Sequence, residues 1–382
     1  MFPFAGADER DLAAGVAAFV NDLRDRIPAA ENEGTIPPDV IRSLGELGVL
    51  GMNVPERDGG LGASAVAFAL VLEELAAVWP SLAVGVSVNS GIVCSSIVRL
   101  GTSDQRGAFF PMLSDGRGLA GFCLTEPTAG SDAASLRAAA RRDGDCWVID
   151  GTKLFVTSAR YAPFFIVLAR IGKAELGRPH AGITAFLVPA GTPGVTIGTP
   201  ERKLGLQASE TSTVTFDGAR VPLASVLGAE GRGFSEVAMA GLDSGRIGIA
   251  AQALGIARGA LSLATAYAQE RKQFGRPIAK FQAVQFRLAD MATEIEAGRA
   301  LLYKAAWLKD QGRDFALAAA QAKLYTGELS NRAANWALQI HGGYGYMDEY
   351  AISRLYRDQK ILEIGEGTNE VQRMVIARQL GL

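Results

Sequence analysis

Cysteine and histidine are both scarce in this chain of 382 residues. It contains three cysteines, Cys94, Cys123 and Cys146, and two histidines, His180 and His341. An odd number of widely spaced cysteines favours reduced thiols over a disulfide framework, and two distant histidines do not suit a metal centre. We therefore expect no metal.

Net charge and long apolar runs are also missing. Lys and Arg number 38 against 40 Asp and Glu, which gives a formal net charge of −2 and does not point to nucleic acid or an anionic membrane as main partner. The most apolar stretch, residues 82–98, is shorter than the roughly 20 residues that span a bilayer, so it predicts a buried helix. Residues 1–10 lack the basic and apolar segments of a secretion signal, and a cytoplasmic protein is expected.

The length and the 48% of hydrophobic residues predict two or three packed domains. Residues 1–120 show helical patterns broken by Gly and Pro, and Thr102 followed three residues later by Gln105 has the spacing of a capping box. Residues 121–230 contain short β-branched and aromatic runs separated by Asp-Gly turn signals. These runs cover residues 146–149, 154–157, 164–168, 183–188 and 213–216.

Residues 231–382 return to helical patterns. Apolar side chains spaced three and four apart predict one long helix, and they are Phe281, Val284, Leu288, Met291 and Ile295. Further helices are expected over residues 314–340 and after Gly367. The predicted fold class is α+β, with an N-terminal α-helical domain (1–120), a middle antiparallel β-domain (121–230) and a C-terminal four-helix bundle (231–382). No Gly-x-Gly-x-x-Gly follows a strand, which disfavours a Rossmann site.

Two distant segments carry the strongest functional signal. They are Leu124-Thr125-Glu126-Pro127-Thr128-Ala129-Gly130-Ser131-Asp132 and Ile364-Gly365-Glu366-Gly367-Thr368-Asn369-Glu370. In the second, glycines on both sides of Glu366 remove side-chain bulk and let a ligand approach the carboxylate. With Gln339, Gly342-Gly343, Gly345-Tyr346, Glu349, Arg354 and Asp358, these segments resemble the acyl-CoA dehydrogenase family, of the flavin-dependent short- and medium-chain type, over essentially the whole chain.

The resemblance implies FAD as cofactor. The positions expected to contact it are Phe122, Leu124, Thr125, Gly130, Ser131, Phe155, Val156, Thr157, Arg271, Phe274, Gln282, Gln339, Gly342, Gly343, Thr368 and Glu370. Phe155 stands where many relatives have Trp, so ring stacking is expected to be retained. Residues 271–275 resemble the segment that reaches FAD bound mainly by a neighbouring subunit, which implies at least a dimer and, by family likeness, a homotetramer.

Each of these positions also has an ordinary explanation. Taken alone, Gly342-Gly343 is more often a helix C-cap, Arg271 a solvated charge, and Phe155 or Phe274 a core residue. Glu366 alone would be a surface carboxylate near a helix N-terminus. Their joint occurrence in family order favours the cofactor site.

The resemblance implies that Glu366 is the catalytic base, which removes the proton α to a thioester while the β-hydrogen leaves as hydride to flavin N5. Burial should raise its pKa toward neutrality. The developing enolate oxygen is expected to meet the backbone N–H of Glu366 and a ribityl hydroxyl of FAD. Some branched- and long-chain relatives place the base where this chain has Gly245, which cannot serve as one.

Substrate contacts implied by the resemblance are Ser131, Asp243, Arg246, Gly365 and Gly367. Without it, Asp243 and Arg246 would be a local ion pair. Many relatives have Tyr immediately before the base, so Gly365 predicts a wider pocket that tolerates branched, polar or bulkier acyl groups.

The expected activity is α,β-dehydrogenation of a short or medium acyl-CoA to the 2-enoyl-CoA, with an electron-transferring flavoprotein as acceptor. Two alternatives stay open. An acyl-CoA oxidase, or a related flavin oxidase or monooxygenase, would keep the fold and use oxygen. The large oxidases carry an extra C-terminal domain that is not expected in a chain of 382 residues, which favours the dehydrogenase. A catalytically silent scaffold that binds flavin or CoA is disfavoured by the intact Glu366.

Overall fold

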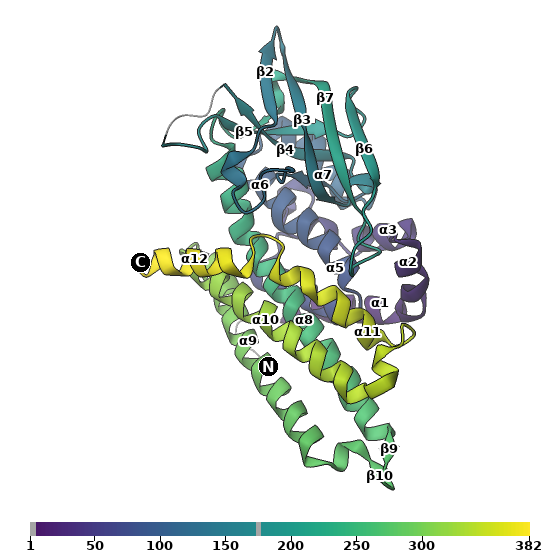
Figure 1. The fold of residues 1–382 in the computed structure, drawn as a ribbon. Helices are drawn as coiled ribbons and strands as arrows, with labels where there is room; N and C mark the ends of the chain where they lie inside the picture. The colour runs from purple at the N-terminus through teal and green to yellow at the C-terminus, as the bar shows by residue number, and fades with distance from the viewer. Residues whose placement is uncertain (1–4, 173–176) are drawn as a thin grey trace.

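The computed structural model describes residues 5–172 and 177–382, and its elements follow the predicted α, β, α order (Figure 1). Helices precede Ser114, the strands of the main sheet lie between Gly121 and Leu227, and helices return from Phe234 onward. This arrangement confirms the predicted fold class. Residues 1–10 were expected not to form a secretion signal, and residues 1–4 of this segment lie outside the described ranges. The cytoplasmic location stays a prediction.

The first region is helical. Its helices are α1 (Ala7–Asp22), α2 (Ile27–Glu33), α3 (Pro38–Glu46), α4 (Ala65–Val78), α5 (Pro80–Val86), α6 (Ser95–Leu100) and α7 (Ser103–Ser114). The predicted capping box opens α7, because Gln105 N donates to Thr102 Oγ1 at 3.2 Å and Thr102 N donates to Gln105 Oε1 at 3.1 Å. Thr102 and Gln105 therefore each satisfy one backbone N–H that a helix start leaves open.

The apolar stretch at residues 82–98 forms a buried helix, as predicted. A π-helical segment, Ser87–Cys94, joins α5 to α6. By length and composition alone, Pro80–Leu100 and Phe234–Glu270 could each cross a membrane, but 78% of the most apolar window of each is buried inside the protein. Such burial fits core helices, and the expectation of no membrane span stays a prediction.

The middle region is one eight-stranded sheet. Its strands are β1 (Gly121–Cys123), β2 (Ala139–Asp143), β3 (Cys146–Thr157), β4 (Phe164–Ile171), β5 (Ile183–Pro189), β6 (Val195–Pro200), β7 (Thr211–Pro222) and β8 (Val226–Leu227). The order is β6-β7-β3-β2-β4-β5-β8, and β1 pairs with β4. Most pairs are antiparallel, while β1 and β2 each run parallel to β4.

Two predicted strands, 146–149 and 154–157, are in fact one. The expected turn at Asp150-Gly151 is wrong, because β3 continues through it with a register shift against β7 between Ile149 and Gly151. Gly151 has φ +148°, so the glycine serves an irregularity within the strand. A second shift, between Lys153 and Val156, lies beside Phe155.

The third region is a helical bundle with α8 (Ala240–Glu270), α9 (Gln282–Asp310), α10 (Ala316–His341), α11 (Ala351–Asp358) and α12 (Asn369–Gln379). The predicted stripe lies on α9, where Met291 and Ile295 are buried. A two-stranded hairpin, β9 (Lys272–Gln273) and β10 (Arg276–Pro277), joins α8 to α9 at the end of the bundle farthest from the sheet (Figure 1).

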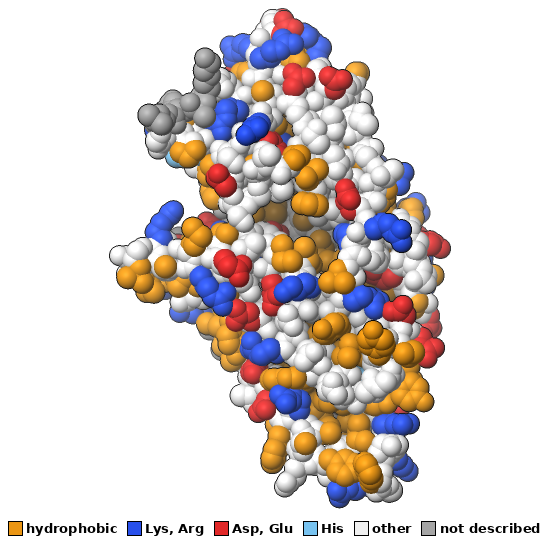
Figure 2. Space-filling model, in the orientation of Figure 1, with side chains coloured by type: hydrophobic (Ala, Val, Ile, Leu, Met, Phe, Trp, Pro, Cys, Tyr) orange, Lys and Arg blue, Asp and Glu red, His pale blue; other side chains and the backbone are white. Residues whose placement is uncertain are grey.

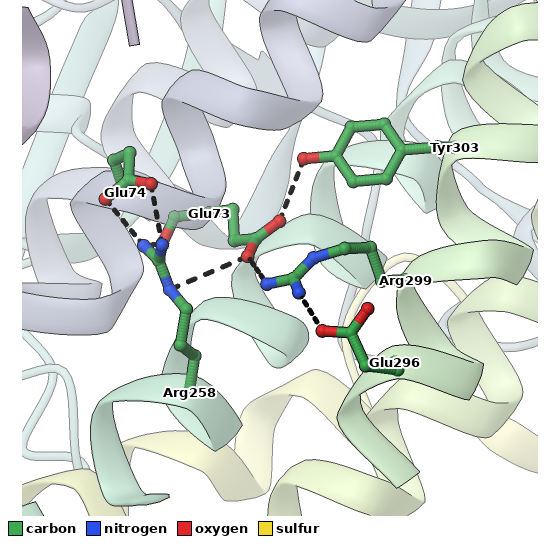
Figure 3. Close-up of polar contacts among 6 residues, drawn as sticks. All are labelled: Glu73, Glu74, Arg258, Glu296, Arg299 and Tyr303. Atoms are coloured by element: carbon green, nitrogen blue, oxygen red, sulfur yellow. Dashed lines mark hydrogen bonds and ion pairs between the residues drawn. The ribbon is translucent and has the colours of Figure 1, made fainter. Parts of the chain in front are cut away.

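The N-terminal helices and the bundle share one apolar core, which includes buried residues of α4, α8, α9 and α10. A polar cluster crosses the same boundary (Figure 3). Glu73 of α4 accepts hydrogen bonds from Arg299 Nη2 at 2.6 Å and Tyr303 Oη at 2.8 Å, and Arg258 of α8 binds the neighbouring Glu74. The two helical regions therefore pack as one body.

Metal-binding groups are not gathered in the described parts of the chain. Within residues 5–172 and 177–382 no group of three or more His, Cys, Asp or Glu side chains could hold a metal ion. All three cysteines are free thiols, and burial raises the pKa of Cys94 and of Cys123 to about 12.

Candidate active site

Glu366 lies in the turn between the 3₁₀ segment Gln359–Glu363 and α12, and its backbone is unusual. Its φ is +54°, a region that side chains other than glycine seldom adopt, and Gly367 follows with φ +93°. A Cβ at Gly367 would lie 2.8 Å from Nε2 of Gln372, a buried side chain that donates to the Gly367 carbonyl at 2.8 Å. Such strained residues are concentrated at functional sites.

The Glu366 carboxylate points at α8. Its Oε2 is buried and accepts no hydrogen bond from any described residue. A Cβ built at Gly245 would lie only 1.8 Å from this oxygen. Gly245 therefore leaves the space that the carboxylate occupies, and a base at 245 and a carboxylate at 366 would compete for one position.

The charge environment suits a base at neutral pH. Burial raises the pKa of Glu366 to about 7, while the positive charges of Lys323 and Arg246 oppose the rise. The direction agrees with the expectation from sequence. Asp243 and Arg246 form an ion pair on α8, and Arg246 is only 5% exposed with its Nε buried and unpartnered among the described residues.

The segment from Leu124 to Ser131 is held against β3 by a buried ion pair that the sequence analysis did not single out. Lys153 Nζ donates to Glu126 Oε1 at 2.8 Å and to the Leu124 carbonyl at 3.2 Å. The Glu126 carboxylate also accepts from Arg137 N at 2.6 Å and Ala138 N at 2.9 Å. A lysine directly before the apolar run Leu154-Phe155-Val156 was the available signal, because a buried cation requires a partner.

Phe155 is presented outward beside this segment. It has φ +56°, lies at the second irregularity of β3 and is 65% exposed. Leu154 N donates to the Thr125 carbonyl at 2.8 Å, which brings Thr125 next to Phe155. The side chains of Val156 and Leu124 instead pack in the apolar clusters of the sheet, so only their backbones can face a ligand here. Phe122 and Thr157 are half-buried, while Gly130 and Ser131 are exposed.

A second group of expected residues lies at the far end of the bundle. A pocket of about 550 Å³ there includes Arg271, Gly342 and Gly343 in its lining. The Arg271 guanidinium lies 5.4 Å from the centroid of the Tyr344 ring. Phe274, with φ +50°, is 93% exposed at the hairpin, and Gln282 and Gln339 are exposed.

These two groups do not meet within one chain, since the hairpin and the sheet lie at opposite ends of the molecule (Figure 1). Thr368 caps α12 by accepting from Val371 N at 3.3 Å. Its neighbour Glu370 is exposed, and the nearby backbone and Thr368 lower the pKa of Glu370.

The residues present fit a flavin dinucleotide. An exposed aromatic face suits a planar ring, and a would-be Cβ at Gly130, Gly342 or Gly343 meets nothing within 4 Å, so their backbones are open to a ligand. A carboxylate that titrates near neutrality can remove a proton from carbon beside such a ring. The fold and site therefore define a flavin-dependent oxidoreductase.

Three family models match in chain order. The Acyl-CoA dehydrogenase N-terminal domain matches residues 6–117, the middle domain 121–219 and the C-terminal domain 231–381. The chain belongs to the acyl-CoA dehydrogenase family, whose enzymes are FAD-dependent oxidoreductases.

Curated relatives and solved structures agree with this assignment. The chain is 45% identical to Probable acyl-CoA dehydrogenase YngJ of Bacillus subtilis, covering 96% of this chain and 97% of that protein. It is 43% identical to the mitochondrial short-chain specific acyl-CoA dehydrogenase of Homo sapiens, covering 92% and 84%. Butyryl-CoA dehydrogenase from Megasphaera elsdenii superposes with a TM-score of 0.96 at 39% identity over 100% of both chains.

A further structure bears on the electron acceptor. A chain in the structure described as "Electron transferring flavoprotein of Acidaminococcus fermentans: Towards a mechanism of flavin-based electron bifurcation" is 38% identical with a TM-score of 0.95, covering 100% of this chain and 99% of that one.

Proposed function

We propose that this chain catalyses FAD-dependent α,β-dehydrogenation of a short-chain acyl-CoA, with Glu366 as the base that removes the α-proton. The observation that carries the assignment is the unpaired, buried Oε2 of Glu366, in a strained turn and with a pKa raised to about 7. Short-chain substrates are favoured because close relatives are named for them.

Each residue of the site has a separate role in the proposed reaction. Glu366 accepts the α-proton, and its pKa of about 7 makes it a stronger base than an ordinary carboxylate while a fraction of it is still ionised at neutral pH. No described residue accepts a hydrogen bond from the Glu366 N–H, so this donor is available to the thioester oxygen where enolate charge develops. Asp243, Arg246, Ser131 and Gly367 hold the substrate. Bound FAD supplies the acceptor for the hydride that leaves the β-carbon.

The working unit is a homotetramer built as a dimer of dimers. Support comes from the far end of the bundle, where large apolar side chains are exposed, as Figure 2 shows at the lower end of the molecule. They are Phe274, Phe286, Tyr346 and Met347. A neighbouring copy on this surface would bring Arg271 and Gly342-Gly343 to a cofactor held by the other chain. Electrons then pass to an electron-transferring flavoprotein.

The test of the base is anaerobic bleaching of the flavin absorbance by butyryl-CoA. Glu366→Gln keeps the size and polarity of the side chain but removes the base, so the variant should bind FAD and ligand and bleach roughly 10²- to 10⁴-fold more slowly. Glu46→Gln, an exposed carboxylate on α3, serves as control and should bleach at the wild-type rate. Undiminished bleaching by Glu366→Gln would reassign the base, and rapid recovery of colour in air would favour an oxidase.

The backbone next to the base leaves space at Gly365. A Cβ there meets only Ile361, at 3.4 Å from its carbonyl oxygen, and the backbone is one that other residues adopt. We infer that branched acyl groups fit next to the α-carbon. Gly365→Tyr should lower kcat/KM for 2-methylbutyryl-CoA roughly tenfold more than for butyryl-CoA. Equal losses on both substrates, together with no wild-type preference for isobutyryl- or 2-methylbutyryl-CoA over butyryl-CoA, would rule this out.

A further inference from the structure

One face of α10 holds the segment that carries Glu366. Lys323, Gly327 and Asn331 are spaced four apart, so they lie on the same side of the helix. Lys323 Nζ donates to Asn369 Oδ1 at 3.0 Å, on the C-terminal side of the base. Asn331 Nδ2 donates to Glu363 Oε1 at 3.1 Å, on the N-terminal side.

Gly327 lets the segment approach closely between these two contacts. A Cβ at this position would lie 3.2 Å from the Leu362 carbonyl oxygen and 3.5 Å from Asn369 Oδ1. The segment from Leu362 to Asn369 is therefore fixed to α10 before and after the base, and Lys323 is the only charged side chain among the three α10 positions.

Lys323 is an unusual residue for such a contact. It is 0% exposed, and its ammonium group donates a hydrogen bond to a neutral amide, that of Asn369. Among the described residues no carboxylate lies within 4 Å of its Nζ. A buried ammonium without a direct ion pair is costly, so anions somewhat farther away must favour its charged form.

The groups facing Lys323 come from three elements. Glu363 and Glu366 before α12, and Glu370 on α12, favour its charge, while Arg246 of α8 opposes it. Burial is the larger effect and lowers the pKa of Lys323 to about 8, which leaves it mostly protonated at pH 7. Reciprocally, Lys323 and Arg246 are the cations that lower the pKa of Glu366.

We propose that Lys323 is a positioning residue for the base: its ammonium group, held by Asn369, fixes the turn and keeps the Glu366 carboxylate ionised at neutral pH. This role rests on the proposed function of Glu366. Arg246 is paired with Asp243 on α8, whereas Lys323 approaches from α10 and, among the described residues, forms no direct ion pair.

The experiment is the pH dependence of anaerobic flavin reduction at limiting butyryl-CoA, since kcat/KM reports groups of the free enzyme. Loss of the positive charge raises the pKa of Glu366, so the rising limb of the profile should move up by roughly one pH unit in Lys323→Met. The rate should fall about tenfold below pH 7 and recover at high pH. Lys323→Gln, which keeps a polar contact for Asn369, should show the same shift and provides a second neutral variant if Lys323→Met does not fold.

Lys309→Met is the matched control, because burial also lowers the pKa of this lysine to about 8, but its carboxylate neighbour is Asp310. Its profile should keep the wild-type midpoint. Asn331→Ala removes the hydrogen bond from the neutral Asn331 side chain to Glu363 without removing a positive charge, and it should lower the rate evenly at all pH values. A Lys323→Gln profile with an unshifted midpoint, or an even loss at every pH, would overturn the proposal while leaving Glu366 as base. Wild-type bleaching by Glu366→Gln would overturn both.

Discussion

At the scale of single residues, the site depends on Gly245 as much as on Glu366. The carboxylate oxygen occupies the volume that a Cβ at 245 would need. The positive φ of Glu366 costs roughly 1–3 kcal/mol, and the surrounding contacts must compensate for this strain. The position of the base is thus determined from both sides, by its own turn and by α8.

We predict that Gly245→Ala impairs catalysis without unfolding the protein. The new methyl group must displace Glu366 Oε2, and a shift of about 1 Å in a catalytic group can cost roughly 10²-fold in rate. The measurement is kcat/KM for butyryl-CoA. Gly15→Ala makes the same change in α1, where a Cβ meets nothing within 4 Å, and should leave kcat/KM unchanged. Full activity of Gly245→Ala would mean that the carboxylate works from another position.

Sequence reasoning identified Glu366, Gly245 and Arg246 but not Lys153 or Lys323. The first three lie in segments that resemble motifs of the family, and the resemblance can be seen in the sequence alone. The two lysines act through burial, and burial depends on packing between segments far apart in sequence, such as Lys323 and Asn369. For the same reason, the sequence did not show that the side chains of Val156 and Leu124 pack in the core, with only their backbones beside the site.

At the scale of elements, the surface expected to face the flavin is a loop bound to an irregular strand. The Lys153–Glu126 pair joins the loop to β3, and Glu126 also binds two backbone N–H groups at the start of the β2 segment. The sequence predicted strands here because β-branched residues alternate with turn signals. It could not predict that β3 runs through Asp150-Gly151, because a strand irregularity and a turn use the same residues.

We predict that Glu126→Gln weakens FAD binding. The change leaves Lys153 buried without a counter-ion and removes one acceptor from the loop, so the apoprotein should show a roughly tenfold or larger increase in Kd for FAD. The double variant Glu126→Gln/Lys153→Met removes both charges and should recover part of the affinity. If the double variant binds FAD more weakly than Glu126→Gln, the charge pair is not what holds the loop.

At the scale of the whole molecule, the elements expected to face the cofactor, the main sheet and the β9–β10 hairpin, lie at opposite ends (Figure 1). The helical domains before and after the sheet share one core, while the sheet packs one face against α6 and α7 and forms a separate cluster on its other face. Domain order was readable from sequence because periodicity changes from helical to strand and back. The contact between α4 and the bundle could not be predicted from sequence. It depends on buried charged residues that are far apart along the chain, and no local pattern shows which of them pair.

We predict that Glu73→Gln destabilises the helical part of the molecule by roughly 3 kcal/mol, because it breaks a buried cluster that joins α4 to α9 (Figure 3). The Arg299 guanidinium would lose its buried partner. Urea unfolding followed by the helix signal in circular dichroism measures the change. Glu74→Gln is the matched control: Glu74 is the adjacent carboxylate but more exposed, and its loss should cost less than about 1 kcal/mol. Equal midpoints for both variants would show that the Glu73 cluster adds no stability beyond that of a surface ion pair.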